Sequence, residues 1–310
     1  MLEINHKQHL YLLSILGLIP ISFFIKNIFK QKPINSLSGR KNIGVVVTGG
    51  SSGFGEALIR EFLKEGHRVA TCSRSPLSKE LQQESCFWKK TDLTSPSESQ
   101  EFISFAQEKL GTIDVFILNA ITVEHDVINQ KFHETTDKST RLMLDVGLTS
   151  YISLTHEVIP IMLKQKFGGH VVFVQGLRCD GRIQKGFTVI GTTKYALSYF
   201  QKSLVSEYSD SAIGFHSINP GMLINTQPFE KMVMFRKMAN IMGITPAGTA
   251  ARMVLPHIMN LEGTNKNYHR MNFLSIEAIY SLNLRVNFSL VSVKVFLKFV
   301  ILDCTLKIIF

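Results

Sequence analysis

Residues 43–48 form a short uninterrupted apolar run, IGVVVT, which is the pattern of a strand buried on both faces of a parallel sheet. The run leads directly into a glycine-rich segment, TGGSSGFG, at residues 48–55. Over residues 56–67, apolar positions then recur at the spacing of an amphipathic helix. The pattern therefore predicts a strand, a tight glycine turn and a helix in immediate succession.

The glycine turn is expected to bind the pyrophosphate of a dinucleotide. Gly49, Gly53 and Gly55 are the positions that need to lack a side chain, because the backbone must approach the phosphates at the helix N-terminus. Such turns also merely connect strands to helices, and only the placement between this strand and this helix favours binding. The predicted phosphate-binding turn comprises Thr48, Gly49, Ser51, Ser52, Gly53, Phe54 and Gly55.

Three further positions follow predicted strands. Arg74 ends the next apolar segment, where an arginine would accommodate the 2′-phosphate of NADP; the alternative is a solvated loop charge. Asp92 could accept a hydrogen bond from the adenine amino group, or it could be a helix N-cap. A fourth apolar run ends at Asn119 and Ala120. We therefore expect an α/β fold, a Rossmann-like doubly wound parallel sheet in a single domain, that binds NADP(H) at the carboxyl ends of its strands.

The two ends of the chain are apolar and basic. Residues 10–25 carry no charge, and three lysines follow by residue 32, so we expect residues 1–41 to be a membrane anchor with a basic linker. A cleaved signal peptide and a buried helix are the rival interpretations. The tail, residues 264–310, has lysines spaced along one helical stripe, which favours a helix lying in the membrane interface over a β-rich or docked tail. The domain, residues 42–263, would then face the cytosol from the endoplasmic reticulum or another organelle membrane.

The charge distribution favours the same partner. The formal net charge of +10 is concentrated at the ends, since residues 1–41 carry +5 and residues 264–310 carry +4, which leaves only +1 on residues 42–263. A nucleic-acid-binding protein would carry a basic face on its folded domain, so we expect membrane lipid and no nucleic acid as partner. The four cysteines form no CxxC pair and no histidine stands at ligand spacing, so no metal site is expected.

The turn at 48–55, Asp92, the Asn-Ala pair at 119–120 and Asn-Pro-Gly at 219–221 together resemble the short-chain dehydrogenase/reductase family. The resemblance covers about residues 42–230 and implies one Rossmann-like domain, usually with a sheet of seven strands. It also implies cofactor contacts at Pro220, Gly221 and Thr226, with substrate bound after this Pro-Gly pair and with homo-oligomers common among family members. Several stretches look most like the chlorophyll b reductase branch, which consists of membrane-associated reductases using NADPH: REFLKEGHRVATCSRSP, GGHVVFV, GTTKYAL and INPGML. The membrane-anchored 3-ketosphinganine reductases are a looser likeness.

The resemblance also implies a catalytic tetrad of asparagine, serine, tyrosine and lysine. Lys194 matches the lysine, but Ile190 stands four residues earlier where the family has its tyrosine proton donor. None of the seven tyrosines has a lysine four residues downstream, which excludes a simple shift of the motif. Gly176 occupies the serine position, as in chlorophyll b reductases, and Gly147 occupies the asparagine position.

Three functional hypotheses remain open. The first is a membrane-tethered NADP(H)-binding protein with weak or no reductase activity. The alternative is a working NADPH-dependent reductase of an apolar carbonyl compound (pigment, sterol or lipid), with a proton from Lys194 after burial lowers its pKa, or less readily from Asp180, Arg178, substrate or water. The third is a structural domain whose cofactor site has decayed. A hydrogen-bond donor near the nicotinamide would favour the second, and an apolar wall from Ile190 would favour the first.

Overall fold

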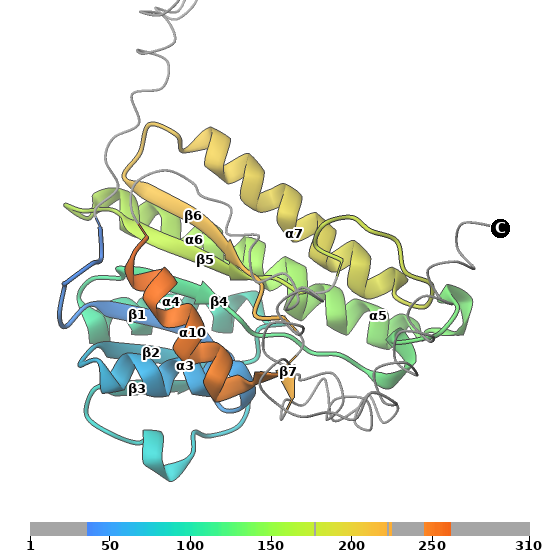
Figure 1. The fold of residues 1–310 in the computed structure, drawn as a ribbon, viewed down its shortest axis with the longest axis horizontal. Helices are drawn as coiled ribbons and strands as arrows, with labels where there is room; N and C mark the ends of the chain where they lie inside the picture. Colours follow the sequence, from blue (N-terminus) through green and yellow to red (C-terminus); the bar gives the residue numbers. More distant parts are fainter. Residues whose placement is uncertain (1–35, 177, 222, 225–244, 262–310) are drawn as a thin grey trace, which may run out of the picture. The chain divides into compact units, whose positions relative to one another are not determined.

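Six parallel strands form the central sheet of this computed structural model, which describes residues 36–176, 178–221, 223–224 and 245–261. The strand order is β3-β2-β1-β4-β5-β6, and every neighbouring pair is parallel (Figure 1). This is the predicted Rossmann-like, doubly wound arrangement. The strands are β1 (Gly44–Thr48), β2 (Arg68–Ser73), β3 (Cys86–Lys90), β4 (Val115–Leu118), β5 (Gly169–Val174) and β6 (Ile213–Ile218).

The apolar runs of the sequence become the inner strands. Every residue of β1, β4 and β5 is buried, which is why these segments contain almost no charge and read as largely continuous rather than alternating hydrophobic stretches. β6 is the other edge strand in the described ranges; it is also fully buried, although its sequence IGFHSI is not a continuous apolar run. β3 lies at the edge of the sheet and is only partly buried, so it tolerates the two lysines with which it ends.

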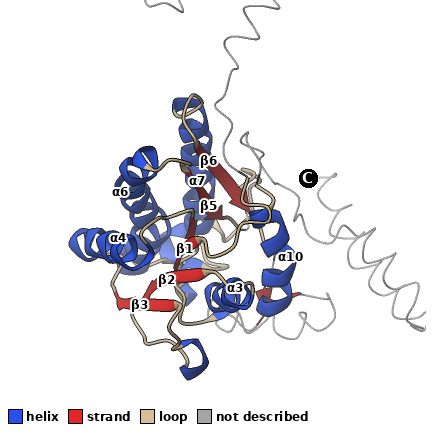
Figure 2. Cartoon of the chain, turned by 90° about the vertical axis from the view of Figure 1, so that its left-hand side faces the viewer, coloured by secondary structure: helices blue, strands red, loops and turns tan. Residues whose placement is uncertain are grey.

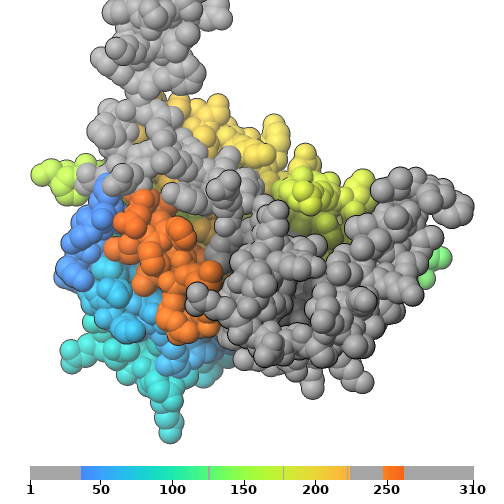
Figure 3. Space-filling view, viewed as in Figure 1, coloured from blue at the N-terminus to red at the C-terminus, as the bar shows by residue number. Residues whose placement is uncertain are grey.

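Helices cover both faces of the sheet (Figure 2). On one face, α3 (Gly53–Lys64) packs beside α10 (Ala247–Met259), which lies at the surface next to the blue N-terminal part of the domain (Figure 3). The other face is covered by α4 (Pro96–Leu110), α6 (Ser150–Lys164) and α7 (Thr188–Glu207), whose apolar side chains form the main core with those of the strands. Two layers of helices therefore enclose the sheet, and its carboxyl edge is left for the loops.

One of these helices is long and apolar enough to cross a membrane. It runs over Asp137–Lys164 and combines α5 (Asp137–Leu144), a π-helical turn (Asp145–Thr149) and α6, and it is the one such helix found in the described part of the chain. Several of its apolar residues, among them Leu154 and Val158, are fully buried in the main core, whereas Ile152 and Leu163 are exposed. Core packing therefore accounts for much of its apolar composition. The predicted anchor and tail lie outside the described residues, except for residues 36–41.

The remaining described elements are short. Three 3₁₀ turns lie at Lys79–Leu81, His125–Val127 and Phe132–Glu134, and β7 (Leu223–Ile224) pairs with β8 (Thr245–Pro246) in a separate two-stranded sheet. Within the described ranges the central sheet thus has six strands, where seven are usual in the family that the sequence resembles. All of the described residues belong to one compact unit, residues 1–270.

Candidate functional site

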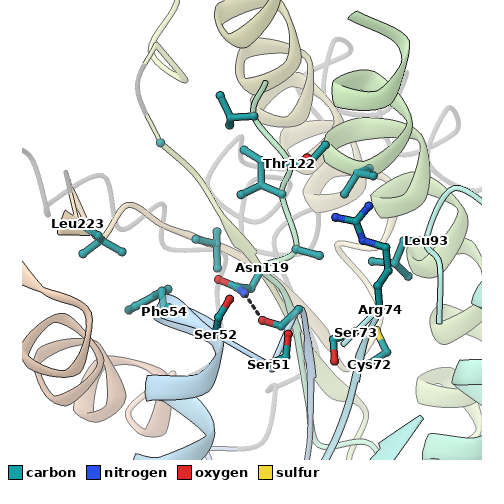
Figure 4. Close-up of a pocket in the computed structure, with 18 of the residues that line it drawn as sticks. Ser51, Ser52, Phe54, Cys72, Ser73, Arg74, Leu93, Asn119, Thr122 and Leu223 are labelled. Atoms are coloured by element: carbon teal, nitrogen blue, oxygen red, sulfur yellow. Dashed lines mark hydrogen bonds between the residues drawn. The ribbon is translucent and has the colours of Figure 1, made fainter. Parts of the chain in front are cut away.

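A cavity of about 360 Å³ opens at the carboxyl ends of the strands and is lined by the segments that follow all six of them. β1 and β4 are neighbours at the centre of the sheet, and from them the chain proceeds outward in opposite directions, so the cavity lies at the topological switch point. Figure 4 shows Ser52 and Phe54 on one side of this cavity, Arg74 and Leu93 on the other, and Asn119 between them.

The glycine turn and the first residues of α3 line the cavity next to the end of β1. Gly49 and Gly53 have φ values of 73° and 62°, which only glycine adopts without strain. Ser52 is the N-cap of α3, but its side chain makes no capping hydrogen bond. The first backbone N–H groups of the helix, which have no partner within the helix, therefore lie beside a cavity and provide donors for an anion.

Two glycines of the turn are required by close packing. A Cβ atom on Gly49 would lie 3.0 Å from Ala120 Cα, and one on Gly55 would lie 2.2 Å from the Gly49 carbonyl oxygen. Gly55 does not line the cavity, so its contribution is to let α3 pack against the turn. This open cradle, together with the helix N-terminus, fits a dinucleotide pyrophosphate.

Thr48 also stays outside the cavity and instead holds together two of the segments that line it. The Thr48 hydroxyl oxygen accepts hydrogen bonds from the backbone N–H groups of Asn119 (2.9 Å) and Ala120 (3.0 Å). The Asn119 side-chain amide in turn donates to the carbonyl oxygens of Thr48 (2.9 Å) and Gly49 (3.3 Å), and the residues around this contact are drawn in Figure 4. These bonds fix the end of β4 against the glycine turn.

Arg74 and Asp92 line one end of the cavity, beyond β2 and β3. Arg74 is exposed, as a guanidinium that receives a phosphate must be. The pKa of Asp92 is lowered, chiefly by the hydrogen bond from the Thr94 backbone N–H and to a smaller degree by the Arg74 charge. Ser95, not Asp92, is the N-cap of α4, so Asp92 does not have the capping role that the sequence left open.

The opposite end of the cavity brings together Gly176, Ile190 and Lys194, three of the four positions implied by the catalytic tetrad. Ile190 packs in a second apolar cluster that includes Val123 and Met143, and it presents a hydrocarbon surface where a proton donor would be needed. Ile121 packs against the same cluster, and Val146, Val174 and Leu223 are further apolar residues that line the cavity.

Lys194 is the charged group at this end, and it is almost fully buried, with 5% of its surface exposed. Its Nζ donates a hydrogen bond to the Val174 carbonyl oxygen at 3.2 Å and lies 6.0 Å from the centre of the Tyr151 ring. Burial lowers the pKa of Lys194 to about 8, and no carboxylate among the described residues pairs with it. The ammonium therefore loses its proton more readily than an exposed lysine does.

Tyr151 lies beneath Lys194 and was not singled out by its sequence. It is fully buried, its hydroxyl donates to the Ala120 carbonyl oxygen at 2.9 Å, and burial raises the pKa of its phenol. Because this hydroxyl is already bonded and does not line the cavity, it cannot replace the missing tyrosine. Gly147 is also outside the cavity, in the π-helical turn, where an added Cβ would lie 3.1 Å from Thr193 Cγ2.

The cavity therefore collects most of the predicted site residues. It is lined by Gly49, Ser51, Ser52, Gly53, Phe54, Arg74, Asp92, Asn119, Ala120, Gly176, Ile190, Lys194, Pro220 and Gly221. Thr48, Gly55 and Gly147 lie behind it, Thr226 is outside the described residues, and neither Asp180 nor Arg178 lines it. Sequence reasoning did not assign the lining residues Cys72, Ser73, Ser75, Thr91, Thr122 and Gln175 to the site. The signal that could have found them is their position at or shortly after the carboxyl ends of strands. In the described ranges no cluster of metal-ligating side chains was found.

Comparison with known sequences extends the resemblance. Residues 44–234 match the sequence model of the family described as short chain dehydrogenase. The chain is 30% identical over 250 residues to the Oryza sativa subsp. japonica protein named probable chlorophyll(ide) b reductase NYC1, chloroplastic; the match covers 72% of this chain and 48% of that protein. It is 28% identical over 230 residues to chlorophyll(ide) b reductase NOL of the same plant, covering 69% and 66%. The chain thus spans about half the length of the NYC1 relative.

Solved structures share the fold at lower identity. A 3-ketoacyl-(acyl-carrier-protein) reductase from Brucella melitensis, complexed with NADH, has a TM-score of 0.64 at 19% identity, with 75% of this chain and 98% of that chain covered. A serine dehydrogenase complexed with NADP⁺ has a TM-score of 0.58 at 20% identity, with 68% and 87% covered. With the sequence match over more than half of its length, the glycine turn and this sheet, the chain belongs to the short-chain dehydrogenase/reductase family.

Proposed function

We propose that this chain binds NADP(H) in the cavity and is a catalytically weak reductase of apolar carbonyl compounds. The glycine turn and the N-terminus of α3 would hold the pyrophosphate, Arg74 the 2′-phosphate, Asp92 the adenine and Lys194 the nicotinamide ribose. When bound, the cofactor supplies a hydride. The observation that carries the proposal is that one cavity joins a phosphate cradle and an exposed arginine to a buried lysine with an apolar wall.

The substrate class follows from the wall around Lys194. Its side chains are hydrocarbon, so a ligand gains most there by burying apolar surface. The relatives named chlorophyll(ide) b reductase are consistent with a large apolar substrate, although a pigment, a sterol and a lipid all meet this description.

The rate is expected to be low because of the residues that line the site. A positioned general acid contributes about 10²–10⁴-fold and one oxyanion donor about 10²–10³-fold, and Ile190 and Gly176 supply neither. Cofactor binding does not depend on these groups, so binding should persist where turnover is slow.

We also propose that the chain acts at an organelle membrane, with residues 1–41 as anchor and basic linker, the domain on the cytosolic side and lipid as its partner. The apolar run at 10–25 and the basic ends support this, and both named relatives are described as chloroplastic. Homo-oligomers, which are common in the family, would be measured by light scattering on the same preparation.

The test is to measure the binding of NADPH and of NADP⁺ to the full chain in detergent, by NADPH fluorescence and by calorimetry. Gly53→Ala should weaken NADPH binding at least tenfold, because φ of +62° is strained for alanine and the shifted backbone no longer meets the phosphates. Gly66→Ala is the matched control, since Gly66 follows α3 at its other end with φ of +81° and open space around it. No NADPH binding by the wild type would refute the proposal and leave a structural domain. Equal effects of the two substitutions would contradict the role of the glycine turn in binding.

The NADP preference has its own variant. Arg74→Asp should shift the ratio of NADPH to NADH affinity by about 10- to 100-fold toward NADH, since hydrogen bonds between charged groups contribute about 1.5–3 kcal/mol. Lys202→Asp makes the same change of charge on an exposed residue of α7 that does not line the cavity. An unchanged ratio in Arg74→Asp would contradict the role of Arg74.

A second candidate, a fully working reductase, is favoured by Lys194. A buried lysine with a pKa of about 8 is a competent proton donor at neutral pH. Wild-type turnover that is abolished by Lys194→Ala, with a rate that falls as pH rises through about 8, would select this candidate.

A further inference from the structure

The Gln175 side chain is a buried polar group without a partner at the edge of the cavity. Gln175 directly follows β5 and is 4% exposed, and its backbone N–H donates to the Ile218 carbonyl oxygen at 2.7 Å. Both atoms of its side-chain amide, Oε1 and Nε2, are buried and have no hydrogen-bond partner among the described residues. Gln175 also lines the cavity.

An amide in this state costs stability. Removing a polar group from water without giving it a hydrogen bond is unfavourable, whereas an apolar side chain of the same length would have no such penalty at this position. Gln201 shows the ordinary arrangement in this protein: it is 1% exposed, and its Nε2 donates to the Phe215 carbonyl oxygen at 2.9 Å. Other buried polar atoms in the described ranges also have no partner, but among their residues Gln175 is the one that lines the cavity, so a ligand is the candidate partner of its amide.

The neighbours of Gln175 indicate which part of a ligand this is. Val174, the preceding residue, provides the carbonyl oxygen that binds Lys194 Nζ, and Gly176, the following residue, stands at the serine position of the family. Gln175 therefore lies at the reaction end of the cavity. Ile190 and the rest of the wall there offer no hydrogen bond to a carbonyl oxygen, and Lys194 Nζ already donates to the Val174 carbonyl oxygen. The Gln175 Nε2 has no acceptor and is a donor.

We propose that the Gln175 side chain turns toward the cavity when substrate binds, so that its buried Nε2 donates a hydrogen bond to the carbonyl oxygen of the apolar substrate and takes over the binding role of the absent serine side chain. This inference rests on the proposed function, since it assigns a substrate contact in the same cavity. Gln175 binds and orients the carbonyl group and transfers no proton.

The experiment measures the affinities of two ligands, 2-acetylnaphthalene and 2-ethylnaphthalene, for the full chain saturated with NADP⁺. The two ligands differ only in that the ketone has a carbonyl group where the hydrocarbon has CH₂. The wild type should bind the ketone about five- to tenfold more tightly, the contribution of one hydrogen bond. In Gln175→Met this preference should disappear, and the melting temperature of the cofactor-free chain should not fall. NADPH binding is measured first for every variant, so that the cofactor end of the site is checked independently.

Two further variants separate binding from structure. Gln201→Met removes a buried glutamine that has a partner, so it should lower the melting temperature and keep the preference for the ketone. Gly176→Ser, added to Gln175→Met, should restore the preference, because a Cβ at position 176 would lie at an ordinary 3.6 Å from Lys194 Cε.

Each outcome decides one of the two proposals. A wild type that does not bind NADPH refutes the proposed function. A wild type that binds NADPH but does not prefer the ketone, or a preference that survives in Gln175→Met, overturns the role of Gln175 alone. A melting temperature that falls in Gln175→Met as far as in Gln201→Met would mean that Gln175 is structural, and would also overturn it.

Discussion

Lys194 places an ammonium group in an almost fully buried position beside apolar side chains. Among the described residues, its contacts are one backbone carbonyl oxygen and the face of the Tyr151 ring, which together stabilise the charge less than water does. The lowered pKa of Lys194, about 8 against an ordinary value of 10.5, expresses this cost. At the scale of the residue, the fold is therefore less stable for having a lysine at this position.

Lys194→Met should consequently stabilise the cofactor-free chain. Below pH 8 the lysine is charged in both the folded and unfolded chains, so the cost of burying the charge is fully present, on the order of 3 kcal/mol at most. Between about pH 8 and 10.5 the folded chain loses the proton first, and the wild type gains stability relative to the variant. Urea unfolding at pH 7 and pH 10.5 measures both values. A wild type that is the more stable at pH 7 would contradict the prediction.

Ile190 occupies the position at which the family that the chain belongs to has its tyrosine proton donor. Because Ile190 and Lys194 are one helical turn apart and both line the cavity, Ile190→Tyr should bring a phenol to the reaction end. NADPH-dependent reduction of 2-acetylnaphthalene, followed by absorbance, should rise about 100-fold or more. Ile190→Phe adds the same ring without the hydroxyl and should show no gain. Equal rates in the two variants would exclude phenol proton donation.

At the scale of the element, α3 and the glycine turn form one unit whose spacing is set by Gly55. A Cβ there would meet the Gly49 carbonyl oxygen at 2.2 Å and Asn119 Nδ2 at 2.5 Å, so α3 would have to move away from the end of β4. Gly55→Ala should therefore lower the free energy of unfolding by about 1–3 kcal/mol, although alanine is the better helix former.

Chemical denaturation of Gly55→Ala, with NADPH titration on the same preparation, measures this effect. NADPH affinity should fall with the stability, because the displaced helix carries the first N–H groups of the phosphate cradle. Unchanged stability and unchanged NADPH affinity would show that the turn relaxes without moving α3.

At the scale of the whole molecule, charge is concentrated outside the folded domain. The first described residues are packed against the domain: Leu37 is buried, and Arg40 forms an ion pair with Asp114 at 2.7 Å. The apolar run of the proposed membrane anchor, residues 10–25, precedes this point in the sequence.

The full chain should therefore sediment with anionic phospholipid vesicles, and deletion of residues 1–35 should greatly reduce the bound fraction. Deletion of residues 271–310, which removes the other apolar and basic segment, is the matched comparison. The difference between the two bound fractions shows how much each end of the chain contributes to vesicle binding. An unchanged bound fraction after the first deletion would contradict the assignment of the anchor.

The sequence alone was sufficient for the fold class. Strands buried on both faces are continuous apolar runs, so β1 and β4 could be recognised from short local segments, and the glycine turn between β1 and α3 marked the switch point. β6, with the sequence IGFHSI, has no such run and was not recognised. The sequence also identified the residues that fall at loop positions directly after strands, such as Arg74 and Asn119, because in a parallel sheet these positions meet at one edge.

Only the tertiary structure decided what these residues do there. Thr48, predicted to bind the cofactor, lies behind the cavity and holds the end of β4, while Gly55 and Gly147 are placed by packing. The burial of Lys194 over Tyr151, the apolar wall around Ile190 and the isolation of the Gln175 amide all arise where segments distant in the sequence meet. The solvation of a side chain and its hydrogen-bond partners depend on which distant segments pack against it. Local periodicity in the sequence indicates which face of an element is buried, but not which atoms lie opposite that face.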